Sequence, residues 1–477
     1  MAQAIRPVRK KRLALAYAVV VGFPAGALVI VLRLGGRLAG ARPLVEAAAA
    51  PAQHISALHL PDLALLVAQL GVIIAVSRAA GSVAQKIGQT RVIGEILAGI
   101  LLGPSFLGWL APEFSAALFP PHSFAVLNAL SQLGLVLFMF LVGLELNWKE
   151  LRHQGPVAIL VSHASIAAPM AMGAALAVYC YSRLAGPTVG FVGFALFMGI
   201  ATSITAFPVL ARILSERKLL GTHMGAMAIA CAAIDDVTGW CVLAYVVAHV
   251  RAADHAASLW MTIGGLVLFV TLMIAVVRKL LGSLERAFVE QGTLSDNRKA
   301  FLLLFLLLSA LTTEMLGLHL LFGAFLAGVV MPRNRALVSY VTGKFESLTV
   351  LLLLPLFFAY TGLRMNIGRV NGIGMWGVCV AITAVAIAGK IGGTSVAARL
   401  GGIGWKESLG LGALMNTRGL MELVVLNIGL DIQVISPPLF SMMIVMALVT
   451  TAMTSPLLNW FEPDASEATE RESRAAT

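Results

Sequence analysis

The chain has 477 residues, of which 59% are hydrophobic and 12% are charged, and its mean hydropathy is +0.90. Soluble globular proteins carry about 25% charged residues, so this composition excludes a soluble globule and predicts an all-α integral membrane protein. The net charge of +11 is explained by a positive excess in cytoplasmic loops. We therefore expect membrane lipid around the chain and no nucleic acid as a partner.

Hydropathy predicts the helices in chain order. A window of about 19 residues finds fourteen apolar segments, at 13–32, 60–77, 92–110, 123–146, 157–181, 188–211, 224–250, 258–277, 300–317, 319–331, 346–363, 374–398, 407–430 and 438–460. The tenth, at 319–331, is short for a hydrocarbon core of ~30 Å at a rise of ~1.5 Å per residue. It must be extended, tilted or partly sheltered by protein.

The first apolar segment is predicted to be an extra, retained helix. It follows the basic run RPVRKKR, but it is longer than the apolar region of a typical signal peptide, and arginines follow it in place of a cleavage site. We expect residues 1–59 to form a basic segment, this helix and a linker. Residues 60–460 are expected to form the transmembrane domain, and 461–477 a short, charged cytoplasmic tail.

The distribution of lysine and arginine predicts the orientation. If the amino terminus lies inside, 25 of the 34 basic residues fall in inner segments, seven in outer segments, and Lys390 and Arg418 within helices. Cytoplasmic loops carry the positive excess. The count therefore predicts that both termini are cytoplasmic, as expected for a multi-pass protein of the cell (inner) membrane.

The segment at 188–211 contains residues that interrupt a helix. Thr202, Ser203 and Thr205 are followed by Pro208, whose missing N–H frees a backbone carbonyl one turn earlier, near Ile204. A freed carbonyl inside a membrane needs a partner. A cavity that holds water or a cation provides one.

The segment at 407–430 is interrupted in a similar way, because its glycines surround Asn416, Thr417 and Arg418. Counted from the second segment and from the ninth, each break falls in the fifth of six segments, with the eighth segment as a bridge. Interrupted helices at corresponding positions of two halves indicate a transporter built from inverted repeats. The ion site is then expected between the breaks.

Two adjacent carboxylates, Asp235 and Asp236, lie inside the apolar stretch 227–248. Charges at membrane depth are costly and typical of an ion path. Neighbouring helix positions project about 100° apart, so we expect one carboxylate to face the ion path and the other to face Lys390 or a helix break. Lys390 must be neutral or paired in a membrane, and an ion pair with one of the two aspartates is expected.

Arg418 and Glu422 are a second pair of buried charges. They stand four residues apart, which places them on one face of a helix. Either they neutralise each other as a structural pair or they serve the ion path as charge-balancing residues. The sequence favours neither reading.

Six strings of the sequence resemble a known family. In chain order they are GEILAGILLGPSFLG, FLVGLELN, ATSITAFPVLARIL, AIDDVTGW, GAFLAGVVMP and MNTRGLMELVVLNIGL. Together they resemble the monovalent cation:proton antiporters, in the Asp-Asp-containing group of sodium/potassium:proton exchangers. The resemblance runs from about Pro61 to Trp460, and two of the strings are most similar to the branch with the plant cation/proton exchangers.

The resemblance implies an inverted-repeat antiporter fold with two broken crossing helices, about thirteen body helices plus the extra one, and a homodimer. It assigns Asp236 as the carboxylate that binds the cation and the proton, and Asp235 as its partner near Lys390. The resemblance also places Thr202, Ser203 and Thr205 in the first crossing helix and Arg418 in the second. We expect the three hydroxyl residues at the first break to contribute to ion and proton binding, and Lys390, Arg418 and Glu422 to balance charge.

Two functions are compatible with these residues. A carboxylate in a low-dielectric cavity lets a proton and a monovalent cation compete for one site, which favours an antiporter without any cofactor. The alternative is a gated potassium efflux pore, although no carbonyl-ring string such as TVGYG is present.

An intramembrane aspartyl protease needs two facing carboxylates, which neighbouring helix positions do not provide, so no enzyme is expected. The choice between sodium and potassium depends on distances that the sequence does not contain.

Overall fold

The computed structural model describes residues 10–38, 62–145, 155–187, 189–217, 219, 222–251 and 256–461, and every regular element in these ranges is helical. Ten helices of the described chain are long and apolar enough to cross a membrane, or eleven if one bent pair is a single span. The prediction of an all-α membrane protein is confirmed. The number of thirteen body helices plus one stays a prediction.

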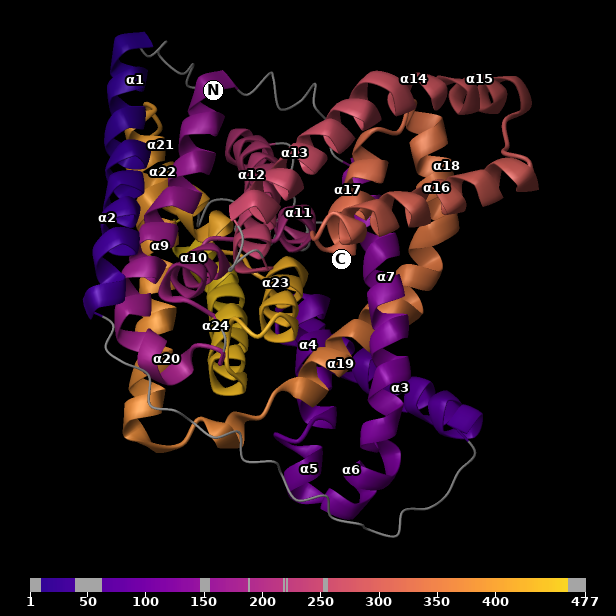
Figure 1. Cartoon of the computed structure of the whole chain (residues 1–477), viewed down its shortest axis with the longest axis horizontal. Coiled ribbons are helices and arrows are strands. Elements are labelled where there is room, and N and C mark those ends of the chain that lie inside the picture. Colours follow the sequence, from indigo (N-terminus) through magenta and orange to yellow (C-terminus); the bar gives the residue numbers. More distant parts are fainter. Residues whose placement is uncertain are drawn as a thin grey trace, which may run out of the picture.

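One group of helices, which we call the crossing bundle, contains both predicted breaks (Figure 1). Its members are α9 (Gly155–Leu184), α10 (Phe191–Ala201), α11 (Phe207–Glu216), α12 (His223–Arg251), α20 (Gly372–Ile387), η6 (Ala388–Gly392), α21 (Gly393–Leu400), α22 (Trp405–Met415), α23 (Leu420–Asp431) and α24 (Pro437–Phe461). Helix α9 packs against α10, α12, α20 and α21, and α24 packs against α20, α22 and α23.

A second group, the flanking bundle, lies beside it (Figure 1). Its members are α3 (Asp62–Lys86), α4 (Arg91–Leu102), α5 (Leu107–Leu110), α6 (Pro112–Leu118), η2 (Pro121–Ser123), α7 (Phe124–Glu145), α16 (Asp296–Met315), α17 (Leu320–Val329), α18 (Arg335–Leu348), η4 (Thr349–Leu353), α19 (Leu354–Arg364) and η5 (Ile367–Arg369). The bundles are connected along the chain by α13 (Ala256–Leu272), η3 (Met273–Val277), α14 (Arg278–Leu280) and α15 (Gly282–Gln291).

The two halves of the sequence contribute to both bundles in the same order. The first half supplies α3, α4 and α7 to the flanking bundle and α9 to α12 to the crossing bundle. The second half supplies α16 to α19 and then α20 to α24 in the same order. This repeated order, with a broken helix at the same place in each half, is the one expected of a transporter built from two repeats.

The short apolar segment predicted at 319–331 forms α17, which is sheltered by protein. It packs against α7 and α16, and Gly143 of α7 faces Gly328 of α17. A Cβ atom on Gly143 would lie 2.2 Å from the Phe325 carbonyl oxygen, and one on Gly328 would lie 2.2 Å from that of Phe140. Small residues at this contact let the two backbones approach closely.

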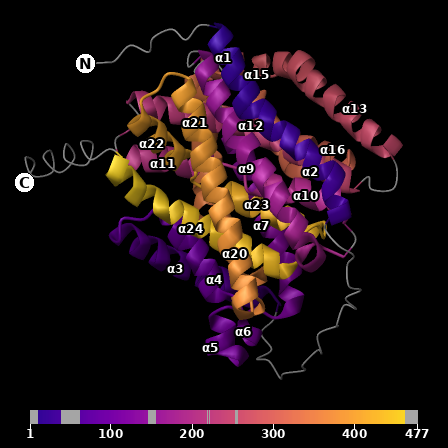
Figure 2. The same cartoon turned by 90° about the vertical axis from the view of Figure 1, so that its left-hand side faces the viewer.

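The predicted extra helix is present as α1 (Lys10–Tyr17), η1 (Ala18–Gly22) and α2 (Phe23–Leu38). It packs along α9 and also contacts α10 and α21, so it lies against the crossing bundle (Figure 2). The Tyr17 hydroxyl is 2.7 Å from Nδ1 of His163 on α9. Most of the predicted linker and the carboxy-terminal tail lie outside the described residues.

Candidate functional site

The two interrupted helices meet at their breaks. Helix α10 ends at Ala201 and α11 begins at Phe207, while α22 and α23 are bent by 46° at residues 416–419. The amide N–H of Ala206 in the first break donates to the Thr417 carbonyl in the second at 2.9 Å. Some of the backbone groups that the breaks release therefore satisfy each other, as a membrane interior requires.

The sequence predicts that Pro208 interrupts a helix and frees a carbonyl near Ile204, and the structure gives this proline a different role. It does not kink a continuous helix but stands in the first turn of α11, after the break has already opened. The missing N–H of proline has no consequence there, because N–H groups of the first turn lack a helical partner anyway. Ile204, near which a freed carbonyl was expected, lines a small cavity.

Asp235 is the carboxylate that faces the lysine. Its Oδ2 atom lies 3.0 Å from Lys390 Nζ and accepts from the hydroxyls of Ser165 at 2.7 Å and Thr205 at 2.8 Å. Its Oδ1 atom accepts from Ser162 at 2.5 Å. The predicted ion pair is confirmed, and each oxygen of this buried carboxylate has at least one partner.

A local distortion places Lys390 in this network. The residue lies in the π-helical turn η6 between α20 and α21, and its side chain is fully buried. π-Bulges are frequent at functional sites. Gly389 allows the close approach of α9, because a Cβ there would lie 2.6 Å from the Cα of Pro169. Lys390 Nζ also donates to the Ser203 carbonyl.

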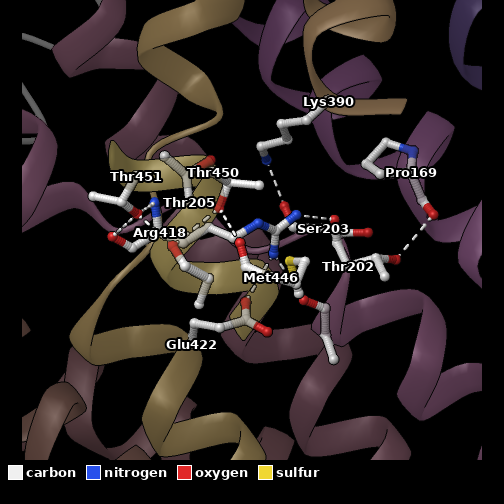
Figure 3. Close-up of polar contacts among 12 residues, drawn as sticks. Pro169, Thr202, Ser203, Thr205, Lys390, Arg418, Glu422, Met446, Thr450 and Thr451 are labelled. Atoms are coloured by element: carbon white, nitrogen blue, oxygen red, sulfur yellow. Dashed lines mark hydrogen bonds and ion pairs between the residues drawn. The ribbon is translucent and has the colours of Figure 1, made fainter. Parts of the chain in front are cut away.

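Arg418 joins the second break to the end of the first half-helix (Figure 3). One guanidinium nitrogen, Nη1, donates to the Ala201 carbonyl and to Glu422 Oε2, both at 2.9 Å, and the other donates to the Thr202 carbonyl. Both charged side chains are fully buried. The pair therefore neutralises itself and caps α10, whose carboxy-terminal carbonyls carry partial negative charge.

The three hydroxyl residues of the first break do not act together. The Thr202 hydroxyl is 3.1 Å from the Pro169 carbonyl and the Ser203 hydroxyl is 3.1 Å from that of Ile166, both on α9. These two side chains fasten the break to α9, and none of the three hydroxyl residues is among those that line the cavity. Thr205 alone reaches an aspartate, and it also lies 3.1 Å from the Met415 carbonyl.

Asp236 has a contrasting environment. It is 5% exposed, and its Oδ1 atom is buried without a hydrogen-bond partner in the described part of the chain. It forms no ion pair with any described residue. The cavity that it lines together with Asp235 is otherwise bounded by Ile204, Gly239, Trp240, Leu243, Met421 and Val425. The expected division between the two carboxylates is thus present, with Asp236 facing the cavity.

Sequence reasoning missed several residues of this site. Ser162 and Ser165 of α9 hold Asp235, and the Thr451 hydroxyl of α24 binds both the N–H and the carbonyl of Arg418, at 2.9 and 2.7 Å. The two serines stand three residues apart, so they share one helix face. That spacing was their only signal in the sequence.

Comparison with known proteins identifies the family. Residues 71–460 match the family model described as the transmembrane part of sodium/hydrogen exchangers. The chain is 42% identical to the Na(+)/H(+) antiporter NhaS4 of Synechocystis sp. over 397 residues, which cover 83% of this chain and 97% of that protein. The resemblance found in the motifs is confirmed.

More distant relatives are longer. The chain is 39% identical to Cation/H(+) antiporter 17 of Arabidopsis thaliana, across 83% of this chain and 48% of that protein. It is 32% identical to K(+)/H(+) antiporter 1 of Saccharomyces cerevisiae, across 79% and 44%. This chain thus spans about half the length of these plant and yeast relatives.

A solved structure supports the fold. The sodium proton antiporter MjNhaP1 of Methanocaldococcus jannaschii superposes with a TM-score of 0.58 at 15% identity, covering 86% of this chain and 98% of that one. At this level of identity the likeness concerns the fold alone. Taken with the family match over residues 71–460, it leads to one conclusion: the chain belongs to the family of transmembrane sodium/hydrogen exchangers.

Proposed function

We propose that this protein is a secondary antiporter that exchanges a monovalent cation, sodium or potassium, for protons across the membrane. The observation that carries the proposal is Asp236, a buried carboxylate that faces a cavity and has no ion-pair partner among the described residues. A desolvated carboxylate is stabilised either by a proton or by a cation. The two ligands therefore compete for Asp236, and no cofactor is required.

The charge balance of the site supports a monovalent ion. When ionised, Asp235, Asp236 and Glu422 carry three negative charges, and Lys390 and Arg418 carry two positive charges, all of them buried. One negative charge is left over. One proton or one monovalent cation neutralises it, whereas a divalent ion would leave an excess positive charge in a low-dielectric site, which is unfavourable.

Exchange also requires that the site open alternately to the two sides. In transporters of inverted repeats, one bundle rocks against the other around a fixed midplane site. Here the proposed cation carboxylate lies in the crossing bundle, while Trp240 beside it touches Phe322 of the flanking bundle with ring centroids 5.2 Å apart. The site therefore lies where relative movement of the bundles would change its access.

The proposal also covers the membrane, the orientation of the chain, the transported ion and the oligomeric state. The basic residues favour a chain in the cell (inner) membrane with both termini cytoplasmic. The name of the NhaS4 relative supports sodium, and that of the yeast relative supports potassium. The family resemblance supports a homodimer, and the roles of Asp236 and its neighbours in ion binding are proposed on the geometry described above.

Flux measurements on the purified protein in liposomes test the proposal. With the membrane potential clamped, an imposed gradient of sodium or potassium should drive proton movement in the opposite direction, at a rate that saturates with cation concentration. Lithium and rubidium extend the selectivity series. Cation flux that does not saturate and moves no protons would instead indicate the pore, and would overturn the antiporter.

A further inference from the structure

The indole N–H of Trp240 is a buried hydrogen-bond donor without a partner among the described residues. Trp240 lies four residues after Asp236 on α12, so the two side chains share one helix face, and both line the same cavity. The indole Nε1 of Trp240 and Oδ1 of Asp236 are each buried without a hydrogen-bond partner in the ranges that the structure describes. Buried polar atoms nearly always have a partner, so a donor and an acceptor left over in one cavity point to a shared ligand.

The indole is held firmly in this position. Trp240 is 5% exposed, and its ring meets Phe322 of α17 edge to face, with centroids 5.2 Å apart and planes at 89°. Edge-to-face contacts are a favoured geometry of aromatic pairs. The indole ring therefore lies at the contact between the two bundles. Packing holds the orientation of the ring and hence that of its N–H group.

In this state the cavity has room for about one water molecule, so the cation can join that water only when the site opens to one side, as exchange requires. The space open to the centre of a water-sized sphere is about 10 Å³, which approaches the volume needed for a single water molecule. Apart from the two aspartates and Trp240, the lining residues are glycine or apolar. Among the described residues that line the cavity, the side-chain atoms that are buried without any hydrogen-bond partner are Asp236 Oδ1 and Trp240 Nε1.

An N–H group cannot coordinate a cation, because its hydrogen carries partial positive charge. It can hold a water molecule, whose oxygen accepts from the indole with one lone pair and faces the cation with the other. A hydrogen of the same water donates to Asp236 Oδ1. This arrangement satisfies both unpartnered atoms, and a bare cation bound to Asp236 satisfies only one.

We propose that Trp240 is a specificity-determining residue that holds a water molecule beside Asp236, so that the monovalent cation is bound partly hydrated. The inference rests on the proposed function in taking Asp236 as the cation carboxylate. Trp240 acts through the water and does not touch the cation. Removing its N–H therefore weakens cation binding more than it slows the maximal rate of exchange.

The test replaces the N–H while keeping the shape of the ring. Incorporation of 3-benzothienylalanine at position 240 exchanges the N–H for sulfur, and Trp240→Phe removes it together with part of the ring. Both changes should raise the apparent KM for sodium or potassium by about five- to tenfold, the worth of one hydrogen bond. Trp376→Phe, at a partly exposed tryptophan of α20, is the matched control and should leave KM unchanged.

The outcomes separate this inference from the proposed function. If the wild type exchanges cations for protons but the benzothienyl variant keeps the wild-type KM, the water bridge is wrong. A rise in KM with Trp240→Phe alone, or an equal rise with Trp376→Phe, would show a packing effect and overturn it as well. If the wild type shows no exchange, the proposed function fails, and cation-dependent thermal stabilisation of the same preparations still reports whether position 240 affects binding.

Discussion

Asp235 and Asp236 are neighbours in sequence, both buried at one cavity, whose bonded partners differ. Asp235 is held by a lysine and three hydroxyl groups, whereas Asp236 lines a cavity and its Oδ1 atom is buried without a hydrogen-bond partner among the described residues. The helix makes this difference, because successive side chains project about 100° apart. One position can therefore serve as a fixed structural anion while the next stays available to a mobile ion.

The Lys390–Asp235 pair can be tested with a double-mutant cycle. Lys390→Ala leaves a buried carboxylate without its cation, and breaking such a pair costs on the order of 3–5 kcal/mol. Thermal stability should therefore fall more for Lys390→Ala than for Lys390→Ala combined with Asp235→Asn. The melting temperatures of the purified variants measure this, and strictly additive losses would show that the two side chains do not interact.

The hydroxyls of the first break are expected to differ in effect. Thr205→Val keeps the shape but removes a bond to the charged Asp235, and such bonds are worth about 1.5–3 kcal/mol. The apparent KM for the cation should rise about tenfold or more, with a smaller loss of folded protein.

Thr202→Val is the matched control for this change. Its hydroxyl donates to a backbone carbonyl of α9, so the variant should lose about 1 kcal/mol of stability and keep its KM. Exchange kinetics and melting curves on both variants distinguish the two roles. Equal KM values for Thr205→Val and the wild type would remove Thr205 from the site.

At the scale of the helices, the sequence was sufficient to locate the breaks. Hydroxyl residues before Pro208, and glycines around Arg418, have no reason to stand in a continuous membrane helix, and the structure interrupts both segments at these points. The ion pair of Lys390 was also predictable, because a buried charge requires an opposite one nearby. Both inferences rest on the free-energy cost of placing particular residue types, helix breakers and unpaired charges, inside a membrane helix.

Other features depend on the direction of side chains and were not predictable. Inside a break the helical period is lost, so nothing in the sequence indicates that the Thr202 and Ser203 hydroxyls turn toward α9 while that of Thr205 turns toward Asp235. Ser165 of α9 finds its partner 70 positions away. Nothing in the sequence indicates that Trp240 lines the cavity with its indole N–H unpartnered among the described residues.

The Arg418–Glu422 pair is expected to be asymmetric. Arg418→Gln leaves Glu422 uncompensated and also removes the cap on the carbonyls of Ala201 and Thr202, so it should cost about 3–5 kcal/mol. Glu422→Gln leaves the arginine bound to those carbonyls and should cost less. Melting of the purified variants compares them, and an equal or larger loss for Glu422→Gln would contradict the capping role.

For the molecule as a whole, the basic residues predict that both termini lie in the cytoplasm. The extra helix turns the thirteen predicted body helices into an even number of crossings, so its retention and the shared side of the termini belong together. A reporter that is active only outside the cytoplasm should be silent when fused to either end of the full chain. Activity at the amino terminus alone would show that this helix does not span, or that another crossing has been counted wrongly.

The central claim is that a proton and a monovalent cation compete for Asp236. Asp236→Asn keeps the volume of the side chain and removes its charge, and Asp296→Asn makes the same change at an exposed position of α16. In proteoliposomes under clamped potential, a cation gradient should drive proton movement with the wild type and with Asp296→Asn, and none with Asp236→Asn, although all three insert normally. Exchange at the wild-type rate by Asp236→Asn would contradict the account.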